Sequence, residues 1–167
     1  MSSRLFEELR EKESLVYSIS AESESYQDTG ILYINTAIEK DSLFKNKNKN
    51  TDNGALFIIL NTLEKILKNG VTQQELNKAK NNFENKISMT YENTNEMALF
   101  YNEQYLFEYT IKFTIQEILD NIKKVTLKKI NNIIKETLSL EKMSICIIGN
   151  YTKEQVYNYL IKTFIKK

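Results

Sequence analysis

Arg10 and Tyr17 are the two side chains near the start of the chain whose chemistry suits contact with a polar ligand. A guanidinium is permanently charged and presents several N–H donors in a rigid fork, which matches carbonyl or carboxylate oxygens. A tyrosine hydroxyl is a neutral donor that needs no deprotonation. Without further context, the ordinary interpretation is that Arg10 is an exposed arginine near a helix C-terminus and that Tyr17 belongs to the apolar face of a strand.

The rest of a catalytic site is missing from the composition. The 167 residues include no histidine and one cysteine, Cys146. A zinc site of histidine and carboxylate ligands, a histidine general base and a Ser-His-Asp triad therefore cannot be assembled from this chain alone. No metal or cofactor site is expected here, and any such chemistry needs another chain. Cys146 lies in the apolar run SICIIG, which predicts a buried thiol without a disulfide partner.

The length, composition and net charge favour a single folded domain and disfavour nucleic-acid and membrane binding. With 41% hydrophobic and 11% aromatic residues, the chain is expected to form a single domain over residues 1–167 with a real core. The formal net charge of +1 gives no long-range electrostatic attraction to nucleic acid or to an anionic membrane. No apolar run is long enough to span a bilayer, and no leader pattern is found, since Glu7 and Glu8 interrupt the N-terminal stretch. We expect a soluble protein, with an intracellular or organelle-matrix location favoured.

The first third of the chain reads as a helix followed by a hairpin. Ser2 or Ser3 can cap a helix that ends near residue 12. Alternating apolar and polar residues predict a strand over 15–25, and the β-rich run ILYINTAI at 31–38 predicts its partner. The low-complexity KNKNKN at 45–50 predicts a solvated loop. A nucleic-acid tether is the alternative for this loop, but no aromatic residue interleaves its lysines.

The remaining chain is predicted to be helical except near its end. Helix spacing, capping boxes and a terminating Gly70 predict helices over about 56–67, 72–91, 93–107, 114–123, 126–138 and 151–167. The aromatic residues of 93–107 are expected to pack in a core rather than to bind a ligand. MSICIIGN at 143–150 predicts a buried final strand. The fold class is thus α+β, with an antiparallel or mixed sheet packed against several helices.

Ordered strings of the sequence resemble one family. SSRLFEELREKESLVYSI at 2–19, SYQDTG at 25–30 and GVTQQELNKAKNNFENKI at 70–87 are similar to segments of the pitrilysin/insulinase family, which includes mitochondrial processing peptidase. VTLKKINNIIKETL and SICIIGN are similar to the end of the same module. These zinc metallopeptidases pair two related α+β halves, and a His-x-x-Glu-His helix in the N-terminal half binds the metal. The present chain resembles the C-terminal half, which has no zinc.

The resemblance assigns roles to Arg10 and Tyr17. They match an arginine and a tyrosine that the family's C-terminal half extends toward the zinc site of the other half, where they hold the substrate backbone and stabilise the oxyanion. The sequence departs from the family near this pair. Glu13 replaces a common Arg, Ser14 a common Gly and Val16 a common Ala, so the turn before Tyr17 is expected to be less free to adopt a positive φ angle.

The family module usually begins with a strand and a helix that precede the SSRLF segment. Met1 coincides with a methionine often found there, so the chain resembles a partial domain that is either a fragment or completed by a partner. A sheet lacking one strand would expose an edge or an apolar face and favour a homo-oligomer or a complex.

The resemblance implies the substrate-binding part of a zinc endopeptidase that acts on unfolded peptides or presequences, with zinc in a partner half or subunit. The alternative is a non-catalytic scaffold or assembly subunit of the same fold. An RNA-binding module is a third class that the charge balance disfavours. Neither the substrate nor the partner can be read from the sequence.

Overall fold

The computed structural model describes residues 3–26, 28–108 and 112–165. The chain divides into two compact units. Unit 1 comprises Met1–Lys68 and Leu140–Lys167, and unit 2 comprises Asn69–Ser139. An antiparallel two-stranded sheet and seven α-helices among the described residues confirm the predicted α+β class. Ser3 caps the first helix, whereas Ser2, the other predicted cap, lies outside the described residues.

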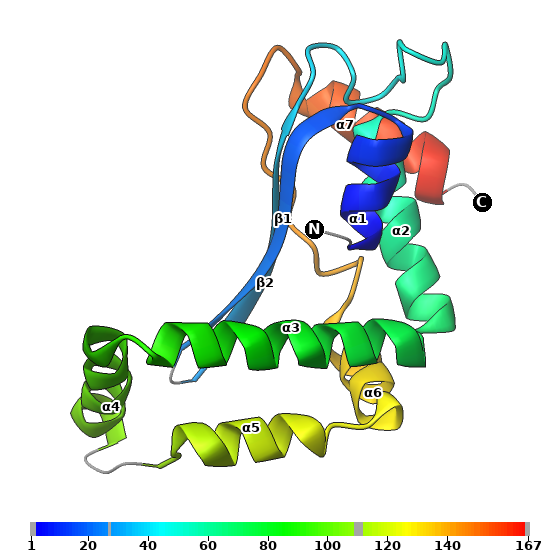
Figure 1. The fold of residues 1–167 in the computed structure, drawn as a ribbon. Helices are drawn as coiled ribbons and strands as arrows, with labels where there is room; N and C mark the ends of the chain where they lie inside the picture. Colours follow the sequence, from blue (N-terminus) through cyan, green and yellow to red (C-terminus); the bar gives the residue numbers. More distant parts are fainter. Residues whose placement is uncertain (1–2, 27, 109–111, 166–167) are drawn as a thin grey trace. The chain divides into compact units, whose positions relative to one another are not determined.

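Unit 1 contains the hairpin, the first two helical segments and the C-terminal helix (Figure 1). Its elements are α1 (Arg4–Phe6), which continues into the π-type segment η1 (Glu7–Lys12), β1 (Val16–Ser25), β2 (Gly30–Ile38), α2 (Ala55–Asn69), α7 (Lys153–Leu160) and η2 (Ile161–Ile165). The strands pair from Val16 opposite Ile38 to Ser25 opposite Gly30. The predicted hairpin and C-terminal helix are therefore confirmed.

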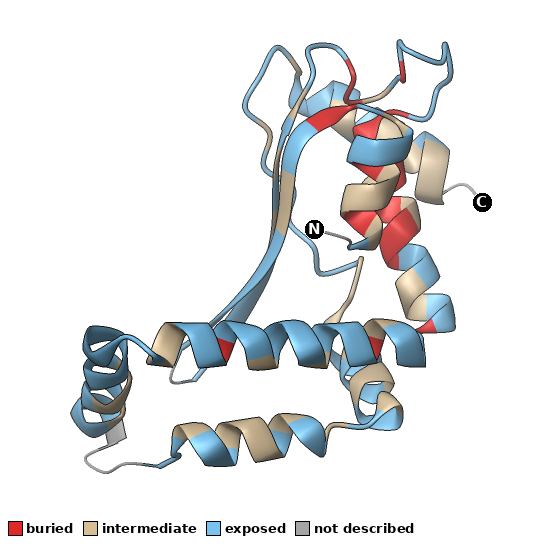
Figure 2. Ribbon diagram, viewed as in Figure 1, coloured by how far each residue is buried: buried red, intermediate tan, exposed pale blue. Residues whose placement is uncertain are grey.

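The core of unit 1 gathers where η1, the start of β1 and α2 meet (Figure 2). Its buried members are Leu5, Leu9, Leu15, Val16, Ala55 and Ile58. A second cluster, formed by Leu43, Leu56 and Leu60, packs against side chains of α7 and its flanking segments. Most of the hairpin beyond this base is exposed, including Ile31 and Leu32. The packed end of β1 is thus the end nearest to the helix that carries Arg10.

Unit 2 consists of α3 (Gln73–Tyr91), α4 (Thr94–Glu108), α5 (Ile115–Lys123) and α6 (Leu127–Thr137). The predicted capping boxes of α3 and α5 are present, because Thr72 and Thr114 each exchange hydrogen bonds with the glutamate three residues later. Gly70 has a φ of +70°, as expected of the residue that ends α2. These helix ends depend on local contacts, and the sequence located them correctly.

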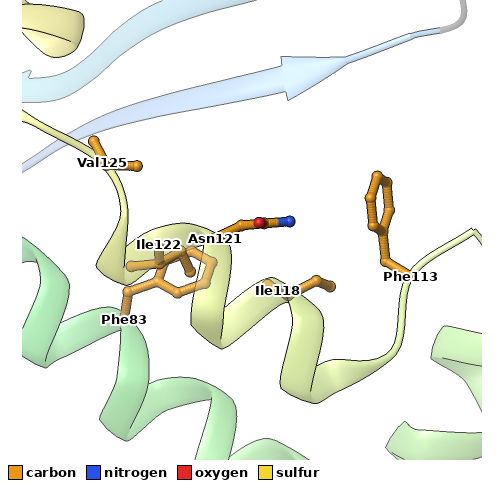
Figure 3. A pocket seen from close by; sticks show the side chains of 6 residues that line it. All are labelled: Phe83, Phe113, Ile118, Asn121, Ile122 and Val125. Carbon is orange, nitrogen blue, oxygen red and sulfur yellow. The ribbon is translucent and has the colours of Figure 1, made fainter.

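The expected core role of the α4 aromatic residues is only partly correct. Phe100 packs against Tyr91 and Tyr101, with ring centroids 5.1 Å and 5.0 Å apart. Tyr105 and Phe107, in contrast, are 62% and 75% exposed. An open apolar depression in unit 2 is lined by residues of α3, α5 and their flanking loops, namely Phe83, Phe113, Ile118, Asn121, Ile122 and Val125 (Figure 3). No ionisable side chain lines it, so it offers no acid or base for catalysis.

The predicted final strand is not formed. Residues 143–148 have no regular secondary structure, and the described sheet contains β1 and β2 only. Ile148 is fully exposed and Cys146 is also exposed, so the prediction of a buried strand with a buried thiol is wrong. An extended apolar run becomes a strand only when a neighbouring strand completes its backbone hydrogen bonds. In the described structure, this run pairs with neither β1 nor β2.

Candidate functional site

The helix that carries Arg10 is fixed by a cap at its start and by apolar contacts on one side. The backbone N–H of Phe6 donates to the Ser3 hydroxyl at 3.3 Å, which satisfies one of the open donors of the first turn. Leu5 and Leu9 are buried in the core of unit 1. Arg10, the residue after Leu9, is exposed. The helix therefore anchors one face in the core and presents Arg10 to solvent.

The helix ends in a left-handed (αL) turn at Ser14, which reverses the chain toward β1. The Leu15 N–H donates to the Leu9 carbonyl at 2.9 Å, and the Ser14 N–H donates to the Arg10 carbonyl at 3.2 Å. Ser14 has a φ of +51°, the left-handed conformation that this turn requires. Leu9 and Leu15 are both fully buried and supply the apolar contact typical of the motif. Ser14 thus adopts the positive φ angle that its replacement of glycine was expected to hinder.

Tyr17 lies at an irregularity in the sheet. Val16 pairs with Ile38, but Ser18 pairs with Ala37, so Tyr17 is the unpaired residue of a β-bulge. Its side chain is 84% exposed, so the interpretation of Tyr17 as an ordinary core residue is wrong. Bulges are common beside functional sites because the extra residue redirects a side chain. Here the bulge follows the buried pair Leu15 and Val16 and turns the phenol into solvent.

The structure brings Arg10 and Tyr17 together. The Arg10 guanidinium carbon lies 5.7 Å from the centre of the Tyr17 ring and 4.9 Å from the centre of the Phe6 ring. Both distances allow cation–π attraction, which at exposed positions contributes about 0.5–1 kcal/mol. The Tyr17 hydroxyl makes no hydrogen bond to any described residue. A charged fork and a free phenolic donor therefore stand side by side, both open to a ligand.

Phe6 was not anticipated as part of this group. It precedes Arg10 by four residues, the spacing that places two side chains on the same face of a helix. That spacing was the available signal. The ring lies beneath the guanidinium and restricts its motion, since the cation is attracted to the face of the aromatic ring.

Farther along the hairpin, two carboxylates share one phenol. The Tyr33 hydroxyl is 3.0 Å from a Glu22 oxygen and 3.1 Å from a Glu24 oxygen. These hydrogen bonds favour the neutral phenol and raise the pKa of Tyr33 to about 12. Hydrogen bonds from Ser20 and then Tyr33 lower the pKa of Glu22. The Glu22 carboxylate therefore stays ionised at neutral pH, and the three side chains link the two strands rather than act as an acid or base.

Comparisons with known proteins found a family model and a relative that match this chain. Residues 1–83, which contain Arg10, Tyr17 and the whole hairpin, match the family model described as the Peptidase M16 inactive domain. The chain belongs to the pitrilysin-like M16 family, as a C-terminal, non-zinc module. It is also similar to a protein of Bacillus subtilis (strain 168) described as "Uncharacterized zinc protease YmxG", with 27% identity over 136 residues. That match covers 81% of the present chain but 31% of the relative, so the chain spans about a third of the relative's length.

The M16 module offers no metal site among its described residues. No group of three or more histidine, cysteine, aspartate and glutamate side chains there is close enough to hold an ion. Among the same residues, no helix is both long and apolar enough to cross a membrane.

The lysines of the KNKNKN loop are all paired. Lys45 lies 3.8 Å from Asp52, Lys47 lies 2.9 Å from Asp41, and Lys49 lies 3.0 Å from Glu13. Phosphate binding by this loop would have to compete with these carboxylates. The arrangement therefore disfavours the nucleic-acid tether.

Proposed function

We propose that this M16 module is the substrate-holding, C-terminal part of a zinc endopeptidase that acts on unfolded peptides or presequences. Arg10 and Tyr17 would face a zinc site carried by another half or subunit. The observation that carries the proposal is the exposed Arg10–Tyr17 pair, which a left-handed turn between buried leucines and a β-bulge direct into solvent. A β-bulge that redirects a side chain in this way is common beside functional sites, which favours a ligand for the pair.

The two side chains suit different parts of a peptide. The Arg10 fork can bind a backbone carbonyl on one side of the scissile bond and so restrict the substrate's orientation. The Tyr17 hydroxyl can donate to the oxyanion that develops at the attacked carbonyl. Zinc in the other half would polarise that carbonyl and activate the water. The contribution of Tyr17 would thus be a hydrogen bond rather than a proton transfer.

The decisive experiment uses the protein isolated from its own source through an affinity tag. Native mass spectrometry would measure the mass of the assembly and its zinc content, and a fluorogenic unstructured peptide would report cleavage. We expect a longer chain or a partner that carries one zinc ion. In that assembly, Tyr17→Phe should lower kcat by about 10²–10³-fold, the usual effect of removing one oxyanion donor.

Tyr157→Phe is the matched control, because Tyr157 is also in unit 1 and is 60% exposed. We expect this variant to cleave at the wild-type rate. If Tyr17→Phe also cleaves at that rate within an intact assembly, the oxyanion role is wrong.

The second candidate is a scaffold or assembly subunit of the same fold. The family description of an inactive domain favours it, since a domain without chemistry can be retained for its surface. A stable complex that contains no zinc would support the scaffold. In that case Arg10 and Tyr17 would be structural residues only.

Association through the hairpin is also a proposal. Ile31 and Leu32 are 52% and 59% exposed on β2, and strand edges readily pair with a second chain. Light scattering at micromolar concentration should therefore give a mass above that of one chain. A single-chain mass, with no binding of a dye for apolar surface, would contradict it.

A further inference from the structure

The loop that contains the KNKNKN run is closed on itself. Asn46 and Thr51 exchange two backbone hydrogen bonds of 2.8 Å and 3.1 Å. The Asn46 side-chain oxygen also accepts from the Lys49 N–H at 3.2 Å. Asn46 is fully buried, although a polar run of this kind was expected to be solvated. The loop is therefore a defined structure with a buried amide at its centre.

The loop is hydrogen-bonded to the C-terminal end of the helix that carries Arg10. The Asn46 amide donates to one carboxylate oxygen of Glu13 at 2.5 Å, and the Lys49 ammonium donates to the other oxygen at 3.0 Å. The same ammonium donates to the Lys12 carbonyl at 3.0 Å, one of the open acceptors at the helix C-terminus. Glu13 is thus held through both of its oxygens. The side chains of Glu13 and Lys49 are 24% and 50% exposed, so the ion pair is only partly screened by water.

Glu13 is the C-cap residue of the helix and immediately precedes the left-handed turn at Ser14. It is the last residue before Ser14, and its own N–H donates to the Arg10 carbonyl. Ser14 carries the left-handed conformation without the freedom of glycine, at a cost that other contacts must offset. Fixing Glu13 from outside fixes the entry to Ser14. Ser14 is followed directly by the buried Leu15 and Val16, which lead into the bulge at Tyr17.

We propose that Glu13, Asn46 and Lys49 form a clasp whose role is to position Arg10 and Tyr17 for the peptide. The proposal rests on the proposed function, since it specifies how the same site is kept in order. None of the three side chains touches the reacting atoms. They are positioning residues, and they act through the left-handed turn at Ser14.

The first test measures local order in the protein itself. Lys49→Met and Glu13→Gln remove parts of the clasp at exposed or half-buried positions and should leave the fold intact. The amides of residues 14–18 should then exchange hydrogen about tenfold faster, as expected when a charged hydrogen bond is lost from a local opening. Lys47→Met and Glu11→Gln are matched controls, because Lys47 pairs with Asp41 in the same loop and Glu11 is exposed on the same helix. Unchanged exchange at 14–18 in both clasp variants would overturn the proposal.

The second test separates positioning from stability, using the zinc-bearing assembly and the fluorogenic peptide. Lys49→Met should lower kcat, and the further effect of Tyr17→Phe should be smaller in this variant than in the wild type, because a displaced phenol has less to lose. Fully additive effects would show that the clasp does not act through Tyr17 and would overturn the proposal. If Tyr17→Phe slows cleavage but Lys49→Met does not, the clasp is wrong and the proposed function stands. If Tyr17→Phe leaves cleavage unchanged, the proposed function fails, and the clasp fails with it.

Discussion

The two units of the chain bury their apolar side chains to very different extents. Among the described residues, all buried hydrophobic side chains except Leu76 and Ile87 belong to unit 1. Unit 2 instead leaves many large apolar side chains exposed, including Phe83, Met89, Leu99, Tyr105, Leu106, Phe107, Phe113 and Ile133. The Arg10–Tyr17 pair lies on the unit with the packed core. A site that depends on geometry is thus built on the part of the molecule least free to deform.

The helices of unit 2 depend more on their own ends than on a shared core. Capping boxes close the N-termini of α3 and α5, and Thr126 caps α6. Each cap stabilises its helix by about 1 kcal/mol, whereas a buried leucine contributes several times as much. Mutations should therefore have large effects in unit 1 and modest effects in unit 2. The predictions below test that difference in order of expected size.

The largest effect is expected for Leu9→Ala. Leu9 is fully buried in the core beside the left-handed turn at Ser14, so the substitution should lower the free energy of unfolding by about 3–4 kcal/mol. Leu106→Ala is the control in unit 2, where the side chain is 63% exposed, and should change that free energy by less than about 0.5 kcal/mol. Urea denaturation followed by circular dichroism measures both. Equal losses would mean that the two units are packed alike.

Gly54→Ala should destabilise unit 1 by about 1–3 kcal/mol through overpacking. A Cβ atom at Gly54 would overlap the backbone of Leu43, Phe44 and Lys45, which cannot move aside as a flexible side chain can. The Ser42 and Leu43 carbonyls accept the N–H groups of Ala55 and Leu56 at the start of α2, so displacing this backbone would also uncap that helix. Gly149→Ala is the control, because its Cβ would meet only the Tyr151 ring at 3.5 Å, an ordinary contact. Thermal unfolding should separate the two variants clearly.

In unit 2, Thr72→Ala should cost about 1 kcal/mol. The Thr72 hydroxyl accepts from the Glu75 N–H at 3.2 Å, and the Glu75 carboxylate accepts from the Thr72 N–H at 2.7 Å. Thr72→Ser keeps the hydroxyl and should be close to neutral. Amide hydrogen exchange in the first turn of α3 would measure the loss directly. If exchange spreads through α2 and the hairpin as well, unit 2 is more strongly coupled to unit 1 than its own caps suggest.

The same contrast explains what the sequence could and could not predict. Helix ends were located correctly because caps such as Thr72 with Glu75 act between residues three apart. The prediction of a final strand was wrong because an apolar segment forms a strand only with a pairing partner, and its own residues do not specify that partner. The prediction that the KNKNKN loop is solvated was wrong at Asn46, which is buried. Its amide donates a hydrogen bond to Glu13, 33 positions earlier in the chain, and local sequence does not indicate such a distant partner. At the site, the resemblance named Arg10 and Tyr17, and the i, i+4 spacing could have suggested Phe6, but the bulge at Tyr17 became visible only in three dimensions.

The smallest effect is expected for Ser14→Gly, and its sign is opposite to the others. Ser14 has a φ of +51°, which costs a residue with a Cβ atom roughly 1 kcal/mol and glycine almost nothing. Glycine also gains conformational freedom in the unfolded chain, which offsets part of that relief. The substitution should therefore raise the free energy of unfolding by less than about 1 kcal/mol. Thermal unfolding measures the shift, and a clear destabilisation would mean that the serine side chain contributes contacts beyond those of the turn. Glycine adopts the left-handed conformation of residue 14 without strain. The turn then depends less on the contacts of Lys49, so Ser14→Gly should also reduce the increase in hydrogen exchange that Lys49→Met causes at residues 14–18. An undiminished effect would show that the clasp holds these residues by a route other than the strained turn.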